Sequence, residues 1–593
     1  MSHALRPANL YLLLTYLALS AVPFVPMLLG KPLARPWQVL GVEFVAWTAA
    51  WAIFKRPAWF HWLLIPAFAA LPTEVYLYTY YGQGISTHHL GIIAETSPKE
   101  AMEFLGSTVW LMLAVMIAVV AWWITSFRAA LRTRDLDWAD SSRYVALAML
   151  AAGAAVYAYG DEFGITAKAP AKASAGAART GLAWPALPHA GRLPVEFGAF
   201  ANSWPFGLVL RSVDFYKERK HLAELGERNS TFTFSARQAQ PDAQPETVVM
   251  VIGESSRFDR WSLNGYERET NPLLGKEANL VTLPDVITSV SATRLSVPVM
   301  LTRKPATQSL KAGFAEKSFL TAYKEAGFKT FWLSNQVSFG EFDTPVSVFA
   351  KEADVIQFVN LGGFTNQSNF DEVLLGPLRN AMADPAPKKL VVLHPLGSHW
   401  NYSHRYPAAF DRWKPSLYGV DKPVITDTKI KPLLNNSYDS SILYTDWFLA
   451  NVIGMLRQGD QRSAMMYVAD HGQTLYDKTC KQVFHGHNTQ FEFHVPAFVW
   501  YSQRYQARHP GKIAQLQKNR AARLSTENVF HTLLDLADIR YPGERSERSF
   551  MNANFREHKR YVDSYGWADY DNATFKGDCR EVIDKGTPLK REK

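Results

Sequence analysis

Three separated segments of the chain carry residue types that could bind a metal ion and perform nucleophilic chemistry. Glu254 ends one short apolar run, and Asp470-His471-Gly472 ends another. Between them lies Thr293, three residues before a Ser-Val-Pro sequence. Carboxylates and imidazoles are suitable zinc ligands, and a threonine hydroxyl becomes a nucleophile when zinc lowers its pKa. Each residue alone is more often a loop, cap or turn residue, but their joint occurrence favours a functional site over that interpretation.

The apolar runs predict the elements that bring these residues together. Short runs alternate with helical stretches, which is typical of an α/β sheet covered by helices; the runs are Val248–Gly253, Lys329–Leu333, Leu390–Leu393, Met465–Ala469 and Val495–Trp500. Ligands bind at the carboxyl ends of such strands. Glu254, His394 and Asp470 each follow a run, so we expect them to meet at one edge. Neighbours in an extended chain point to opposite sides, so a turn at Gly472 is expected to aim Asp470 and His471 at one ion.

The first quarter of the chain is apolar, whereas the remainder has the composition of a soluble protein. The whole chain of 593 residues has a mean hydropathy of −0.13, too polar for a protein embedded entirely in a membrane. Five runs are expected to cross a bilayer, the last being the shortest: Asn9–Gly30, Trp37–Phe54, Pro57–Tyr81, Phe104–Ser126 and Tyr144–Tyr159. The first lacks a convincing cleavage site, so we interpret it as an anchor.

Basic residues beside these runs predict the orientation of the chain. Arg6, the Lys55-Arg56 pair and four arginines between residues 128 and 143 fall on one side, and fewer basic residues fall on the other. The bias favours a cytoplasmic N-terminus. With five spans, everything after Tyr159 lies in the periplasm. We therefore expect a transmembrane domain over 1–160, a membrane-interface bridge and linker over 161–246, and a periplasmic catalytic domain over 247–593.

The formal net charge of +9 is not accompanied by a dense Lys/Arg run or a nucleic-acid motif. A basic face toward anionic lipid or lipopolysaccharide fits this pattern better than nucleic acid. Two cysteines, Cys480 and Cys579, give no disulfide framework; in the periplasm they could form one bridge, and two free thiols are an equal alternative.

The motifs around Glu254, Thr293 and Asp470-His471 resemble those of the phosphoethanolamine transferases of Gram-negative envelopes, in the alkaline phosphatase/sulfatase superfamily. The resemblance covers nearly the whole chain. It implies that Glu254, Asp470 and His471 bind zinc and that Thr293 is both the nucleophile and the fourth ligand. It further implies an inner-membrane, multi-pass protein with its catalytic domain in the periplasm.

The same resemblance assigns further residues to the substrates. His399 and His485 match histidines that contact the transferred phosphate or a second zinc, as catalytic and substrate-binding residues. Asn335 resembles part of a polar substrate-lining segment. Thr96 and Glu100 match a loop that helps to bind the donor lipid, although Ile92 stands where the family has asparagine.

The implied reaction moves phosphoethanolamine from phosphatidylethanolamine to a lipopolysaccharide acceptor, through an intermediate on Thr293. The acceptor is lipid A or a core sugar (heptose or Kdo), and periplasmic glucan is also possible. Two departures favour a core sugar or a related acceptor: the chain has only two cysteines, and His399-Trp400 replaces the His-Gly of lipid A enzymes. The alternatives are a phosphoglycerol transferase and a sulfatase-like phosphoester hydrolase acting on periplasmic glucan or lipid. A sulfatase would need an arginine where the chain has Met300. A non-enzymatic anchored binding module would give no reason for the four site residues to occur together.

Overall fold

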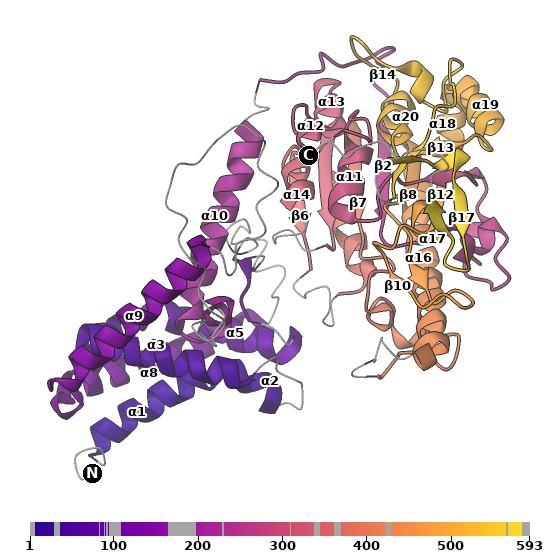
Figure 1. The fold of residues 1–593 in the computed structure, drawn as a ribbon. Helices are drawn as coiled ribbons and strands as arrows, with labels where there is room; N and C mark the ends of the chain where they lie inside the picture. The colour runs from indigo at the N-terminus through magenta and orange to yellow at the C-terminus, as the bar shows by residue number, and fades with distance from the viewer. Residues whose placement is uncertain are drawn as a thin grey trace, which may run out of the picture. The chain divides into compact units, whose positions relative to one another are not determined.

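The computed structural model describes residues 6–28, 36–81, 84–87, 89–90, 93, 108–163, 197–227, 231–308, 310–336, 344–360, 369–420, 423, 428–564 and 567–583. The chain divides into two compact units, Met1–Tyr216 and Lys217–Lys593. The first unit is helical and the second is an α/β domain (Figure 1). The predicted fold class is confirmed.

The helical unit contains the apolar runs expected from the sequence. Its main helices are α1 (Pro7–Ser20), α3 (Pro36–Phe54), α5 (Ile65–Tyr81), α8 (Thr108–Arg132), α9 (Ser142–Phe163) and the first part of α10 (Gly207–Glu227). Within the described residues, three helical stretches are long and apolar enough to cross a membrane, and a fourth span results if α1 and the bent segment Val22–Leu28 form one. The fifth expected span lies in α9, whose apolar part, Ser142–Val156, is shorter. The count of five spans stays a prediction.

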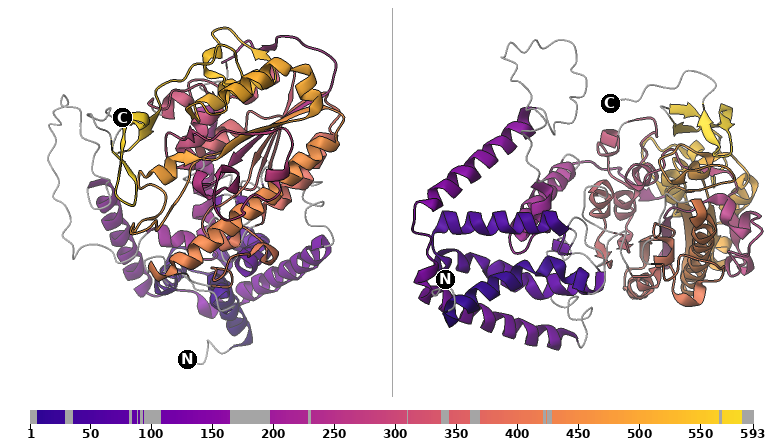
Figure 2. Two further views of the ribbon diagram at one scale, coloured as in Figure 1. Left: turned by 90° about the vertical axis from the view of Figure 1, so that its right-hand side faces the viewer. Right: turned by 60° about the horizontal axis from the view of Figure 1, so that its bottom comes forward.

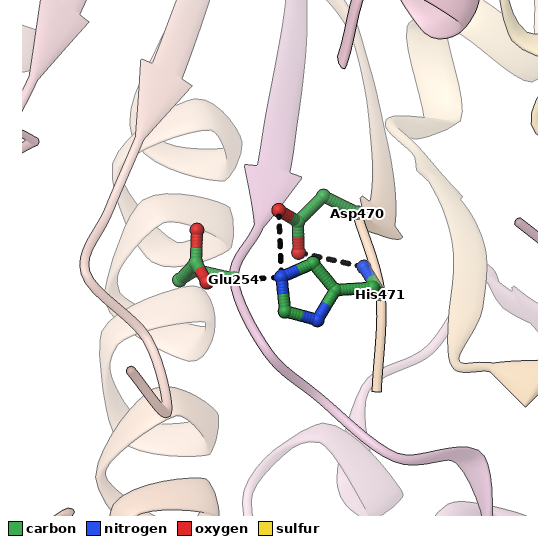
Figure 3. A group of neighbouring side chains, drawn as sticks. All are labelled: Glu254, Asp470 and His471. Carbon is green, nitrogen blue, oxygen red and sulfur yellow. Dashed lines mark hydrogen bonds and ion pairs between the residues drawn. The ribbon is translucent and has the colours of Figure 1, made fainter. Parts of the chain in front are cut away.

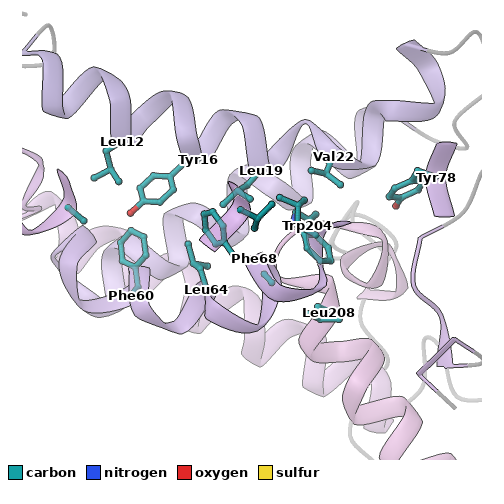
Figure 4. Packing of buried hydrophobic residues seen from close by; sticks show 14 residues of the cluster. Leu12, Tyr16, Leu19, Val22, Phe60, Leu64, Phe68, Tyr78, Trp204 and Leu208 are labelled. Carbon is teal, nitrogen blue, oxygen red and sulfur yellow. The ribbon is translucent and has the colours of Figure 1, made fainter. Parts of the chain in front are cut away.

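The helical unit has its own packed interior. Buried side chains of α1, of α5 and of the turn before α10 pack together, among them Tyr16, Phe68 and Trp204 (Figure 4). Large apolar side chains on the outside remain exposed, such as Trp110 at 72% and Leu111 at 65%. An apolar exterior around an apolar core is what a lipid environment requires.

Two buried polar contacts fix the start of α10 inside this unit. The Arg211 guanidinium forms an ion pair with Glu74 of α5, with 3.0 Å between Nη1 and Oε1. The backbone N–H of Trp204 donates to Glu43 Oε1 of α3 at 2.6 Å. Charged groups surrounded by apolar helices are stable only when they are paired in this way.

The α/β unit is built on a seven-stranded sheet of order β3-β12-β8-β2-β7-β5-β6. The strands are β3 (Leu280–Thr282), β12 (Ala497–Tyr501), β8 (Arg462–Ala469), β2 (Glu246–Gly253), β7 (Lys388–His394), β5 (Lys329–Ser334) and β6 (Val355–Phe358). From β8 to β6 all neighbours are parallel, whereas β12 is antiparallel to β8 and β3. The five runs predicted as strands are therefore confirmed. Pro496 interrupts the last run because it lacks an N–H, leaving β11 (His494–Val495) in a separate small sheet.

Helices cover both faces of this sheet (Figure 2). The long helix α16 (Lys431–Gln458) packs with α15 (Leu375–Ala383), while α11 (Thr293–Leu301) and α13 (Phe319–Glu325) pack with α20 (Asn528–Leu536). With both faces covered, β2 is buried along its whole length. The parallel strands β8, β2, β7 and β5 all end at one edge of the sheet, where the predicted site residues follow them.

A disulfide ties the end of the chain to the segment that follows β8. Cys480 is bonded to Cys579, which lies between β17 (Thr574–Lys576) and β18 (Glu581–Ile583). Of the two states left open by the sequence, the structure has the bridge.

Candidate active site

Glu254 lies directly after the central strand β2 and is 1% exposed. The backbone then turns sharply, because Ser255 adopts a φ of 55°. This turn lets the Ser255 N–H donate to Asp470 Oδ1 at 3.0 Å, while the Asp470 N–H donates to the Gly253 carbonyl at 2.8 Å. These two hydrogen bonds join the ends of β2 and β8 and thereby place Glu254 beside Asp470.

Asp470 and His471 point to one place even though they are adjacent in the chain (Figure 3). The expected turn at Gly472 is not found, because the chain bends at Asp470 instead. Gly472 is needed for space and not for an unusual backbone conformation. A Cβ atom at this position would lie 2.1 Å from the carbonyl oxygen of Phe491. The Gly472 N–H donates to the Glu492 carbonyl at 2.8 Å. A close backbone approach of the next segment therefore requires the glycine.

The Glu254, Asp470 and His471 side chains offer three ligand atoms that lie within 4.8 Å of one another. His471 Nε2 is 3.6 Å from Glu254 Oε1 and 3.6 Å from Asp470 Oδ2. His471 Nδ1 donates to the Gly472 carbonyl at 2.8 Å, so in the neutral ring the Nε2 lone pair faces the carboxylates. A lone pair and two buried carboxylates directed at one point need a cation, and this donor set suits zinc.

Thr293 is the first residue of helix α11 and places its hydroxyl at the same point. Its Oγ1 donates to Asp470 Oδ2 at 2.7 Å and lies 3.2 Å from Glu254 Oε2 and 3.4 Å from His471 Nε2. The structure thus brings together the four residues predicted for the metal site and the nucleophile. The N-terminus of α11 adds a positive dipole end beside the hydroxyl, which favours an anionic group there.

His485 and His399 lie near this cluster. The rings of His485 and His471 are 4.4 Å apart between centroids. Burial, with the Arg405 charge next, lowers the pKa of His399 to about 4, so its ring is neutral at physiological pH. Its Nδ1 donates to the Trp400 carbonyl at 2.7 Å, which leaves Nε2 able to accept a proton. His394, by contrast, is buried against Trp332 with a centroid distance of 5.8 Å.

Asn335 lies one layer behind the ligands. It is fully buried, and its Nδ2 donates to Asp371 Oδ1 at 2.9 Å. Its neighbour Gln336 is the residue that reaches the site, with Nε2 donating to Glu254 Oε2 at 3.1 Å and to the Pro395 carbonyl at 2.9 Å. Thr96 and Glu100, predicted to bind the donor, lie outside the described residues.

Asp371 was missed by the sequence reasoning. Its two carboxylate oxygens accept from the backbone N–H groups of Leu396 and Gly397, at 2.7 and 2.9 Å. Next in the chain, the Ser398 N–H donates to the Glu254 carbonyl at 3.1 Å. Asp371 therefore holds the turn that leads to His399, and no local sequence pattern points to it.

Glu492 was missed as well, and it holds the segment that carries His485. Its Oε2 accepts from the N–H groups of Gly486 and His487 at 2.9 and 3.0 Å, and its Oε1 accepts from Thr474 Oγ1 at 2.7 Å. The side chain is fully buried. The one signal in the sequence was an acidic residue between Phe491 and Phe493, which would be unusual in a buried stretch unless the acid were paired.

Comparison with known proteins identifies relatives of both units. A model of the sulfatase family matches residues 246–539. The phosphoethanolamine transferase EptC of Escherichia coli (strain K12) is 27% identical over 511 residues, covering 82% of this chain and 81% of that protein. The Kdo(2)-lipid A phosphoethanolamine 7''-transferase of the same strain is 30% identical over 329 residues, covering 53% and 55%.

Among solved structures, the chain is similar to the C-terminal periplasmic domain of EptC from Escherichia coli, crystallised in complex with zinc. The TM-score is 0.51 at 29% sequence identity, and the match covers 57% of this chain and 95% of that chain. The family resemblance expected from the motifs is confirmed.

Proposed function

The α/β unit of this chain contains a sulfatase-family domain, residues 246–539, within the alkaline phosphatase/sulfatase superfamily, and on that premise we propose that the chain is a zinc-dependent phosphoethanolamine transferase of the bacterial envelope. The donor is phosphatidylethanolamine and the acceptor is lipopolysaccharide, at lipid A or a core sugar. The helical unit is embedded in the inner membrane, and the α/β unit works in the periplasm.

One observation carries the proposal: the Thr293 hydroxyl lies within 3.4 Å of Glu254, Asp470 and His471. A threonine at the start of a helix commonly caps it, but a cap directs its hydroxyl at backbone N–H groups. Here the hydroxyl is directed at two carboxylates and an imidazole instead. That arrangement suits an activated nucleophile.

In the first step, Thr293 Oγ1 attacks phosphorus while Asp470 Oδ2, at 2.7 Å, accepts the hydroxyl hydrogen bond. The bond from phosphorus to the glycerol oxygen breaks, diacylglycerol leaves with a proton, and phosphoethanolamine remains as an ester of Thr293. In the second step an acceptor hydroxyl or phosphate displaces it and restores the threonine. His399, neutral and with Nε2 able to accept, takes the proton of an acceptor hydroxyl. His485 stabilises phosphoryl oxygens.

Glu254, Asp470 and His471 would hold one zinc ion, with Thr293 at the fourth position. When bound, zinc lowers the pKa of the threonine hydroxyl and offsets negative charge on the phosphoryl group. His399 and His485 are available for a second ion or for the phosphate directly. Thr96 and Glu100 are proposed contacts of the donor headgroup.

We would test the reaction by expressing the wild type, Thr293→Ala and Thr293→Ser in a Gram-negative host. Mass spectra of purified lipopolysaccharide and of periplasmic glucan would be recorded. A phosphoethanolamine increment is expected with the wild type, a smaller one with Thr293→Ser, which keeps a hydroxyl, and none with Thr293→Ala. The modified fraction identifies the acceptor.

Two outcomes would contradict the proposal. An increment that survives Thr293→Ala would remove the threonine as nucleophile. A phosphoglycerol increment, or no increment from folded and zinc-loaded protein, would indicate a phosphoglycerol transferase or a hydrolase of another phosphoester.

A further inference from the structure

Two aromatic side chains join the loops that carry His399 and His485. Trp400 directly follows His399, and Phe484 directly precedes His485. The rings of Trp400 and Phe484 are in contact, with 4.8 Å between their centroids and an angle of 60° between their planes. Both side chains are only partly buried, whereas the three proposed metal ligands are buried. An aromatic surface that a ligand can reach therefore lies beside the two histidines of the site.

The Trp400 ring is held by a second aromatic contact. It meets the Tyr402 ring with a centroid distance of 5.2 Å and an angle of 90°. Tyr402 in turn packs edge to face against Tyr438 of helix α16, at 5.0 Å between centroids. Tyr402 and Tyr438 are fully buried. A ring that rests on such a buried pair keeps its orientation, so a ligand that contacts Trp400 does not first have to order it.

The backbone of Phe484 is strained. Its φ of 73° lies in the left-handed region, which is unfavourable for a bulky side chain. The segment is held by the pairing of β10 (Val483–Phe484) with β9 (Thr474–Leu475), and by Glu492, which accepts from two backbone N–H groups just beyond His485. Strain of this kind persists only where the surroundings impose it, and it is concentrated at sites that bind ligands.

A partly exposed aromatic surface distinguishes between the two kinds of acceptor group in the proposed reaction. The face of an aromatic ring carries partial negative charge. It therefore repels a phosphate group but attracts the partially positive C–H groups of a sugar ring. The surface of Trp400 and Phe484 thus fits a sugar ring better than it fits a phosphate.

The proton acceptor beside this surface indicates the same kind of acceptor group. His399 Nδ1 donates to the Trp400 carbonyl at 2.7 Å, so the lone pair of the neutral ring is on Nε2. A sugar hydroxyl must lose a proton when it attacks phosphorus, and a positioned base accelerates that step. A phosphate acceptor is already ionised at neutral pH and needs no base.

We propose that Trp400 and Phe484 form an acceptor subsite that binds a sugar ring, and that Trp400 selects a sugar hydroxyl over a phosphate group. The inference rests on the proposed transfer reaction and deepens it, because it makes the acceptor group a sugar hydroxyl of the core or of periplasmic glucan.

The second step of the transfer then balances as follows. The sugar ring packs on the aromatic pair, and its hydroxyl oxygen forms a bond to phosphorus while its proton passes to His399. The bond from phosphorus to Thr293 Oγ1 breaks, and Oγ1 leaves with the bonding electron pair. The proton that His399 then releases restores the threonine hydroxyl.

The test compares acceptors, using the purified full chain in detergent with phosphatidylethanolamine as the donor. Core oligosaccharide freed of phosphate, periplasmic glucan freed of phosphate, and lipid A that keeps its phosphates are added separately. Phosphorus NMR of the products distinguishes a phosphodiester on a sugar oxygen from a diphosphate. We expect kcat/KM for one of the two phosphate-free acceptors to exceed that for diphosphate formation about 10-fold or more. The better of these two acceptors identifies the source of the sugar.

Trp400→Ala should lower the ratio of kcat/KM for the sugar acceptor to kcat/KM for diphosphate formation about 10-fold, mainly through KM for the sugar. Trp400→Phe, which keeps an aromatic ring, should retain most of the ratio. Tyr418→Ala, at an aromatic residue of the same unit that is 42% exposed, is the matched control and should leave the ratio unchanged. Partial unfolding of a variant lowers both rates equally and cancels in the ratio.

His399→Gln provides an independent measurement. It should slow transfer to the sugar acceptor about 100-fold or more, and diphosphate formation less than about 10-fold, because only the hydroxyl requires a base.

Three results would overturn this inference alone: a diphosphate formed as fast as the phosphodiester, an unchanged ratio in Trp400→Ala, or an equal slowing of both products in His399→Gln. Release of diacylglycerol is measured in parallel without any acceptor. If zinc-loaded wild type released none, the proposed function would be contradicted, and this inference with it.

Discussion

At the scale of single residues, Glu254 is held by its neighbours on both carboxylate oxygens. Gln336 Nε2 donates to Oε2 at 3.1 Å, and Ser255 Oγ donates to Oε1 at 2.5 Å. Ser255 Oγ in turn accepts from Gln473 Nε2 at 2.9 Å. These contacts fix the direction of a ligand that would otherwise rotate about its side-chain bonds, and outer partners of this kind tune metal affinity.

Gln336→Leu should weaken zinc binding about 10- to 100-fold, because Glu254 loses the donor that orients Oε2. The affinity would be measured by competition with a chromophoric chelator. Gln503→Leu, at an exposed position of the same unit, is the matched control and should leave the affinity unchanged. Unaltered zinc affinity in Gln336→Leu would show that Gln336 does not orient the ligand.

Glu246, at the start of β2, gives the α/β unit a pH-dependent stability. Burial raises its pKa to about 7, against smaller opposing effects of Gln238 and nearby cations. The folded chain therefore keeps the proton at pH values where the unfolded chain, with an ordinary pKa near 4.5, has lost it. The contribution of Glu246 to the free energy of unfolding should fall as pH rises from about 4.5 to about 7 and then level off.

Glu246→Gln should remove this contribution and, at pH 8, raise the free energy of unfolding by about 1–3 kcal/mol relative to the wild type. The two proteins should be equally stable near pH 4.5. Chemical denaturation at both pH values measures the difference. Asp460→Asn, which changes an exposed acid, serves as the control. If the free energies of unfolding of the wild type and of Asp460→Asn both rose between pH 5 and pH 7, the assignment to Glu246 would be contradicted.

At the scale of elements, the site is assembled from strand ends, one helix start and two loops. The strand ends are fixed by the ladder of β2, β7 and β8, whereas the loops are fixed by buried carboxylates. Asp371 holds the turn before His399, and Glu492 holds the turn after His485. These loops therefore depend on polar contacts that cost free energy when one partner is removed.

Glu492→Ala should lower the free energy of unfolding by about 2–4 kcal/mol, because backbone and threonine donors are left buried without an acceptor. It should also reduce the transfer rate through misplacement of His485, while zinc stays bound to Glu254, Asp470 and His471. Urea denaturation, metal content and turnover would be measured on the same preparation. Full turnover in a destabilised but zinc-loaded variant would show that Glu492 is structural only.

At the scale of the whole molecule, the proposed function assigns the lipid to one unit and the chemistry to the other. The predicted spans and the buried polar contacts of Glu43, Glu74 and Arg211 lie in Met1–Tyr216. All four residues of the proposed metal site lie in Lys217–Lys593. A covalent connection between a lipid-embedded unit and a catalytic unit raises the effective concentration of a membrane donor at the site.

A chain that begins at Lys217 should therefore keep its zinc but lose about 100-fold or more of its transfer from membrane-embedded phosphatidylethanolamine. Metal analysis and the lipopolysaccharide mass spectra described above provide the two readouts. The full chain carrying the same affinity tag is the control. Transfer by the shortened chain at the full rate would show that the helical unit does not present the donor.

The sequence by itself determined the α/β class, the five strand runs, the apolar first quarter, and the four residues Glu254, Thr293, Asp470 and His471. The class, the strand runs and the apolar quarter follow from local patterns, because apolar runs predict buried strands. The roles of the four residues follow from the resemblance of their motifs to those of the phosphoethanolamine transferases. Only the tertiary structure decided that Cys480 and Cys579 are bridged, that Gly472 is required by the approach of Phe491, and that Gln336 reaches Glu254 while Asn335 turns to Asp371. These depend on contacts between segments that are far apart in the chain. Asp371 and Glu492 escaped the sequence reasoning for the same reason: a buried carboxylate is stable only because of donors that folding brings to it.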